Sequence, residues 1–158
     1  MRRKKMKKLF SGFLVICFIL SSVGAAFSAE KAGTAAEAVA MVKKAIVYIK
    51  AHGREKAFAE FSNPKGPFID RDLYVTVYDM KGVCLAHGFN PKMVGKNMID
   101  LKDPDGKAFV KERNEMAKTK DKFWVDYKYV NPLTKQIEQK SQYVEKLGDI
   151  LVNCGIYK

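Results

Sequence analysis

The chain has 158 residues, of which 47% are hydrophobic, and a formal net charge of +12 at pH 7. This length allows one domain with its own hydrophobic core and excludes two domains of ordinary size. Six of the positive charges lie in the first eight residues, and the other lysines are mixed with acids, as in VKERNEMAKTKDK. Without a basic stripe and interleaved aromatics, the pattern argues against a nucleic-acid surface, although a mildly positive domain suits a small anion.

The first 30 residues have the order of a secretory signal: MRRKKMKK is basic, LFSGFLVICFIL is apolar, and SSVGAAFSAE is small and polar. We predict a signal peptide over residues 1–29, cleaved near Ser28. The alternative is an uncleaved inner-membrane anchor, because Leu9 to Phe27 is about long enough to span a bilayer. In either case the basic end stays inside, so residues 30–158 are expected to be periplasmic or secreted.

Two helices are predicted after the leader. Residues 34–52 place Val42, Ile46 and Ile49 on one face, which is typical of an amphipathic helix. Gly53 interrupts this pattern, and REKAFAEFSN follows as a shorter helix that ends before a proline. PKGPFIDRD is predicted to be a loop.

The rest of the chain alternates between strands and one helical crossover. LYVTVYD and VCLAHG are predicted strands joined by a DMKG turn. KAFVKERNEMAK is a predicted helix with Phe109, Val110 and Arg113 at helical spacing, whose start Asp103 or Asp105 would cap. FWVDYKYV, IEQKSQYVEK and DILVNCGIY are three further predicted strands. This order predicts an α+β domain with an antiparallel sheet.

These segments, in this order and spacing, resemble a known family, the single Cache domains, which are PAS-like extracellular sensor modules of bacterial receptors. The resemblance covers nearly all of residues 54–157. It rests on EKAFAEF, GPFIDRDLYVTVYD, GVCLAHGFNPKMVGKN, DLKDPDGKAFVKE, FWVDYKYVNPLTKQIEQKSQYV and ILVNCGIYK. We therefore expect residues 30–158 to form one single Cache domain.

The resemblance implies a long N-terminal helix packed on a five- to six-stranded antiparallel sheet, with a helical crossover after strand two. The other face of the sheet would enclose a pocket for a small organic anion of the acetate, propionate, lactate or pyruvate class. The family senses by binding, so no enzymatic activity and no cofactor are implied. The motifs of nucleophilic hydrolases are also missing from the sequence.

The cysteines raise a separate question, because two of them in an exported domain invite a disulfide. The PAS-like strand order implied by the resemblance would place strand one between strand two and the last strand. Cys84 and Cys154 would then lie about two strand spacings apart, beyond the reach of about 7 Å that a disulfide allows. We expect both thiols to be unpaired.

Receptors of this family continue past the domain into a membrane helix and a signalling output, whereas this sequence ends at GIYK. We accordingly expect a sensor module without its own output, which signals through a membrane receptor or transporter partner. The alternative is a structural docking module with a degenerate pocket, forming a homodimer through the helix over residues 34–52.

The resemblance also suggests site residues. His87, at the end of LAHG, is expected to face the pocket, although a strand-end histidine can equally be satisfied by a backbone carbonyl. Lys140 is the first candidate to hold a ligand carboxylate, since a lysine in a half-buried strand is costly without an anionic partner. Lys140 and Tyr143 match a lysine and a tyrosine of the family, so the resemblance suggests Tyr143 as a second ligand contact. The alternative interpretation is that Lys140 is a solvated strand lysine or belongs to a structural ion pair.

Aromatic residues complete the candidate pocket. Trp124, Tyr127, Tyr74 and Tyr78 are candidate wall residues, yet strand alternation means that they cannot all share one face. LKDPDGKAFVKE partly fits a calcium loop, but a leucine occupies its first ligand position. We predict no metal there, and instead helix capping with a pocket-side role for Asp103.

Overall fold

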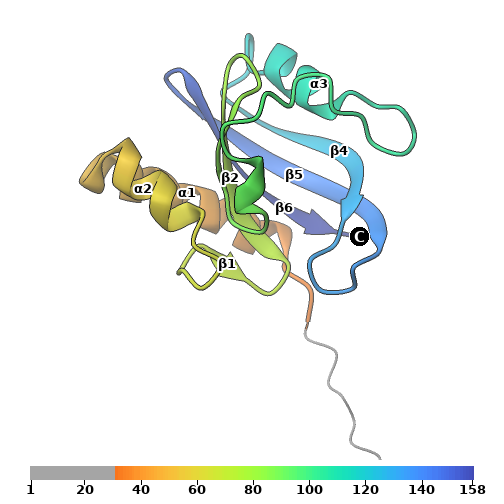
Figure 1. Ribbon diagram of the computed structural model, residues 1–158, viewed down its shortest axis with the longest axis horizontal. Coiled ribbons are helices and arrows are strands. Elements are labelled where there is room, and N and C mark those ends of the chain that lie inside the picture. The colour runs from red at the N-terminus through yellow and green to blue at the C-terminus, as the bar shows by residue number, and fades with distance from the viewer. Residues whose placement is uncertain (1–30) are drawn as a thin grey trace, which may run out of the picture.

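An antiparallel sheet carries the site in the computed structural model, which describes residues 31–158 (Figure 1). The predicted signal peptide over residues 1–29 lies outside the described residues. The helices are α1 (Ala35–His52), α2 (Arg54–Phe61), the short 3₁₀ helix η1 (Pro91–Met93) and α3 (Phe109–Met116). The strands are β1 (Ile69–Asp70), β2 (Leu73–Asp79), β3 (Cys84–His87), β4 (Lys122–Val130), β5 (Ile137–Leu147) and β6 (Ile150–Tyr157).

Strand β2 is the centre of the sheet topology. The order is β1-β2-β6-β5-β4, with β3 also paired to β2, so the predicted α+β architecture with five to six strands is confirmed. Thr76 of β2 pairs with His87 of β3 and with Asn153 of β6, which places β2 between those two strands. β2 and β3 are the first and second predicted strands, so this agrees with the expected PAS-like order. Cys84 and Cys154 are both free and buried. They belong to separate hydrophobic clusters, one on each side of the sheet.

Helix α1 covers one face of the sheet (Figure 1). Thr34 caps its N-terminus in a capping box with Glu37, whose pKa is lowered to about 2 by hydrogen bonds from Thr34 and Arg71. Val42 and Ile46 pack against the strand residues that point to this side. The predicted helix over 34–52 is confirmed, with Thr34 as its cap.

The other face of the sheet is covered by α3 and by the segment between β3 and α3. Phe109 and Val110 of α3 pack with Val125, Val144 and Leu151 in a second buried cluster. Among the described residues, no helix has both the length and the apolar composition that a membrane span needs. The sheet is thus buried on both faces, and a polar side chain between the two layers is removed from water.

Two local expectations were wrong. Strand β1 falls in the segment predicted as a loop, because two residues are too short for a periodic pattern. Helix α3 begins at Phe109 rather than at Lys107, and no side chain caps it. The carboxylate of Asp103 instead accepts the backbone N–H groups of Asp105 and Lys107, which closes the turn before the helix.

Removing the capping box should weaken the attachment of α1. We expect Thr34→Ala to lower the free energy of unfolding by about 1 kcal/mol, since it frees a backbone N–H group at the helix start. Urea denaturation followed by circular dichroism measures this change. The matched control is Thr119→Ala, whose exposed hydroxyl bonds only within its own turn. An equal effect of both changes would contradict the assigned role of the cap.

Candidate functional site

Polar and aromatic side chains gather on the sheet face opposite α1. Successive residues of a strand point to opposite faces, so Lys140 and Gln142 of β5 share this face with Tyr74 and Thr76 of β2. We call the whole set the polar layer. Its members are Tyr74, Thr76, Tyr78, His87, Arg113, Tyr127, Tyr129, Lys140, Gln142, Asn153 and Tyr157.

Lys140 lies at the centre of this layer and is only 1% exposed. Its Nζ donates to the hydroxyl of Tyr74 at 2.7 Å and to that of Tyr157 at 3.1 Å. The same nitrogen lies 4.0 Å from the centre of the Tyr74 ring. Gly155 of β6 makes room for it, because a Cβ there would lie 2.5 Å from Lys140 Cε.

Lys140 forms no ion pair with a carboxylate among residues 31–158. Burial lowers its pKa from an ordinary value near 10.5 to about 7, and the more distant carboxylate of Asp72 opposes this shift only in part. The structural ion pair considered from the sequence is therefore not what holds Lys140.

Arg113 brings a second buried cation to the layer from α3. It is 1% exposed, and its guanidinium carbon lies 4.0 Å from the centre of the Tyr78 ring. Its Nη1 donates to Gln142 Oε1 at 3.1 Å, while Nε and Nη2 are buried and have no acceptor in the described part of the chain. Burial also lowers the pKa of Arg113. Nε and Nη2 form one edge of the guanidinium, and this edge matches the two oxygens of a carboxylate.

His87 closes the layer at the end of β3. Its ring stacks on Tyr74, with 5.3 Å between centroids, and its Nδ1 accepts the backbone N–H of Asn90 at 3.0 Å. Burial, together with the charge of Lys140, lowers the pKa of His87 to about 3. The ring is thus neutral at physiological pH, and with Nδ1 accepting, Nε2 carries the proton as a donor.

Tyr127 and Tyr78 form walls of the layer. Tyr127 lies opposite Lys140 in the β4–β5 register and stacks on Phe109 at 4.0 Å between centroids. Burial raises the pKa of both tyrosines, so their hydroxyls stay neutral. Of the residues predicted from the sequence, the structure therefore brings together His87, Lys140, Tyr74, Tyr78 and Tyr127.

Trp124, Tyr143 and Asp103 are not part of this layer. Tyr143 is three positions from Lys140 on β5, so it points to the α1 side, where it packs in the core and its hydroxyl donates to Glu145. Trp124 pairs with Tyr143 in the register and is 37% exposed. Asp103 accepts a third N–H, from Lys128, which fastens its turn to β4.

The layer also contains residues that the sequence patterns did not mark as site residues: Thr76, Arg113, Tyr129, Gln142, Asn153 and Tyr157. For Arg113 a signal was present, because it shares the apolar face of its predicted helix with Phe109 and Val110. A charged residue on a buried helix face needs a hydrogen-bonding or charged partner, and this requirement could have identified Arg113 as a candidate site residue. For Tyr157, only the pairing of β6 with β5, which sets it opposite Lys140, reveals the contact.

Residues 20–158 match the family Single Cache domain 2. The chain belongs to this family. Cache domains are sensory ligand-binding domains found outside the cell in chemoreceptors, and the chain shares their fold with solved members. The resemblance noted from the sequence motifs is confirmed.

A curated relative is the methyl-accepting chemotaxis protein McpP of Pseudomonas putida strain KT2440, which is 27% identical over 90 residues. This match spans 56% of the chain and 16% of that much longer receptor. The crystal structure of a methyl-accepting chemotaxis protein from Vibrio parahaemolyticus has a TM-score of 0.68 at 23% identity, covering 77% of this chain and 86% of that one.

A second solved structure, described as the basis for carboxylic acid recognition by a Cache chemosensory domain, has a TM-score of 0.66 at 23% identity. The match covers 77% of this chain and 91% of that one. At this level of identity, the likeness shows the fold.

Replacing Lys140 with an uncharged residue should stabilise the ligand-free protein. We expect Lys140→Met to raise the free energy of unfolding by about 1 to 3 kcal/mol at pH 7, since a buried cation without an anion opposes folding. The unfolded chain holds this proton up to about pH 10.5 and the folded chain only up to about pH 7. The destabilisation therefore grows as the pH falls from 10 to 7, and the gain from Lys140→Met should be smaller at pH 9 than at pH 7.

Urea denaturation at both pH values measures this difference. Lys128→Met, at an exposed lysine paired with Asp105, is the matched control and should change stability little. A Lys140→Met protein less stable than the natural one at both pH values would contradict the assigned electrostatic cost.

Proposed function

We propose that the chain is an extracytoplasmic sensor module that binds a short organic carboxylate within the polar layer. The observation that carries this proposal is the free Nε and Nη2 edge of Arg113, buried in the same layer as an ammonium that lacks an acid. Two buried cations of this kind are costly unless an anion joins them. A carboxylate would supply the missing charge and the missing acceptors together.

The donors differ in what they offer a ligand. The Arg113 edge can hold both oxygens of a carboxylate in parallel hydrogen bonds, which fixes the orientation of the group. Lys140 has one N–H left after its bonds to two tyrosines, and His87 can donate from Nε2. The rings of Tyr74, Tyr78 and Tyr127 would border the ligand, and such walls favour a chain of a few carbons.

The family supports this proposal, because its members are sensory domains, and a solved neighbour is described by its recognition of carboxylic acids. We further propose that residues 1–29 direct the domain out of the cytoplasm and that the bound state is read by a membrane receptor or transporter. Acetate, propionate, lactate and pyruvate are the ligands to test first. The docking alternative, through α1, predicts instead that none of them binds.

Thermal melts of the purified chain with these four carboxylates provide the direct test. A ligand at about one hundred times its dissociation constant should stabilise the protein by about 2.7 kcal/mol and raise the midpoint by several degrees. Lys140→Met and Arg113→Lys should each weaken the binding at least about tenfold, since the first removes a charge and the second removes the paired edge.

Lys128→Met should bind like the natural protein, because Lys128 alternates on β4 with Tyr127 and Tyr129, so its side chain points away from the polar layer and forms an exposed ion pair with Asp105. A folded protein that responds to no carboxylate would shift the assignment to the docking function. Undiminished binding by Arg113→Lys would exclude Arg113 as the group that holds the ligand.

Binding should also depend on pH in a defined direction. A carboxylate prefers the protonated form of Lys140, which has a pKa of about 7 in the empty protein. Affinity should be greatest below pH 7 and fall as the pH rises, reaching about one tenth of its maximum by pH 8. His87 stays neutral across this range and adds no dependence.

Calorimetric titrations at pH 6 and pH 8, each in two buffers of different ionisation enthalpy, measure both the affinity and the proton taken up. Equal affinities at the two pH values, without proton uptake, would contradict a role for Lys140 in holding the anion.

A further inference from the structure

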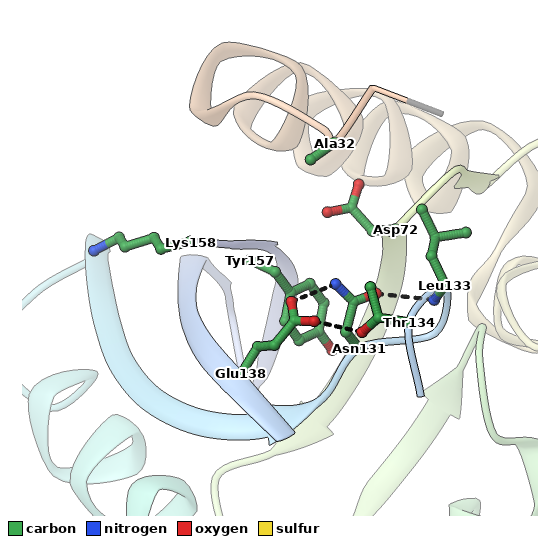
Figure 2. A pocket seen from close by; sticks show the side chains of 8 residues that line it. All are labelled: Ala32, Asp72, Asn131, Leu133, Thr134, Glu138, Tyr157 and Lys158. Atoms are coloured by element: carbon green, nitrogen blue, oxygen red, sulfur yellow. Dashed lines mark hydrogen bonds between the residues drawn. The ribbon is translucent and has the colours of Figure 1, made fainter. Parts of the chain in front are cut away.

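A hollow lies beside the polar layer, at the ends of β4 and β6 (Figure 2). It has a volume of about 490 Å³, within the range of small-molecule sites. Tyr157 separates the two regions, since it lines this hollow while its hydroxyl bonds to Lys140. We call it the rim pocket. Its lining residues are Ala32, Asp72, Asn131, Leu133, Thr134, Glu138, Tyr157 and Lys158.

Asp72 gives the rim pocket a buried negative charge. The residue is 0% exposed, and its Oδ1 accepts the backbone N–H of Gly33 at 2.6 Å. Its Oδ2 is buried and has no hydrogen-bond partner among residues 31–158. Figure 2 shows the carboxylate projecting from the start of β2 toward Ala32, into the hollow. Burying a carboxylate oxygen without a hydrogen-bond donor costs free energy, as does burying the Nε and Nη2 edge of Arg113 without an acceptor. For the carboxylate, the missing partner is a cation.

Glu138 adds a second carboxylate to the same pocket. Its oxygens accept from Asn131 Nδ2 at 2.7 Å and from the hydroxyl of Thr134, which hold the side chain in place (Figure 2). The one basic residue in the lining, Lys158, extends away from the acids, and its Nζ lies 3.5 Å from Asp126. The charge that faces the hollow is therefore negative.

We propose that the rim pocket binds the primary ammonium group of a small organic cation. Asp72 Oδ2 would accept one N–H directly, Glu138 would contribute the second negative charge, and the side chains of Leu133 and Ala32 would contact a short carbon chain. A metal ion is less suited to the pocket, because a hard cation takes six or more oxygen ligands. In addition, residues 31–158 contain no group of three metal-ligating side chains. This inference is independent of carboxylate binding in the polar layer.

The test uses the purified chain with ethylammonium and ethanolammonium chloride, against sodium and potassium chloride at the same ionic strength. Nuclear magnetic resonance follows the backbone amides of Gly33 and Leu133, since the first donates to Asp72 and the second to Asn131. We expect both amides to shift in a saturable manner with the ammonium salts and not with the alkali salts. Absent shifts, or equal shifts with sodium, would overturn the proposal without any variant.

Variants then identify the acid that binds. Asp72→Asn keeps an oxygen for the Gly33 N–H and removes the charge, so the affinity should fall about tenfold or more while the melting temperature changes little. Glu138→Gln should weaken binding as well. The matched control is Asp149→Asn, which removes one acidic charge from an exposed pair with Arg54 at the β5–β6 turn, at the other end of these strands.

The control should bind like the natural protein. Unchanged affinity in both Asp72→Asn and Glu138→Gln, or an equal loss in Asp149→Asn, would overturn the rim pocket as the site. Carboxylate binding measured on the same samples distinguishes this failure from a failure of the proposed sensor function.

Discussion

The burial of Lys140 without an acid beside it is the constraint on which the site depends. The ammonium is enclosed by tyrosine rings and hydroxyls, so it has hydrogen-bond acceptors, but none of the residues that the structure describes brings a counter-charge into direct contact. Arg113, which reaches the same layer from α3, is likewise a buried cation, stacked on Tyr78 with Nε and Nη2 unpaired among the described residues. A sheet covered on both faces excludes water from these cations, and in such a setting electrostatic attraction to an anion is stronger than in water.

The sheet geometry explains why this arrangement can persist. On β2, period-two alternation puts Val75 and Val77 in the core against α1 and the polar residues on the other face, so this strand serves both the core and the site. Gly155 leaves the volume that the Lys140 side chain fills. The acids of the rim pocket lie beyond Tyr157, where Asp72 partly offsets the charge of Lys140 without pairing with it. Opposite charges are thus kept in neighbouring regions, and we propose a ligand of the opposite sign for each.

The sequence predicted much of this fold and part of the site. Amphipathic spacing identified α1, and alternation identified β2, β4, β5 and β6, because long periodic segments carry a strong local signal. Lys140 and Tyr143 were proposed together, although three positions on a strand put them on opposite faces. Arg113 could not be matched to Gln142 from local patterns, since that contact joins a helix and a strand 29 residues apart. The turn role of Asp103 likewise depends on β4, which follows it by 25 residues.

The titration of Lys140 itself tests most directly whether it is a buried cation without an anion. The carbon-13 resonance of its Cε reports the protonation state, in the presence and in the absence of a short carboxylate. We expect a midpoint near pH 7 for the ligand-free protein, and a higher midpoint when the anion is bound. A midpoint near the ordinary value of 10.5 in the empty protein, or one that no carboxylate moves, would contradict the claim that this buried cation lacks an anion.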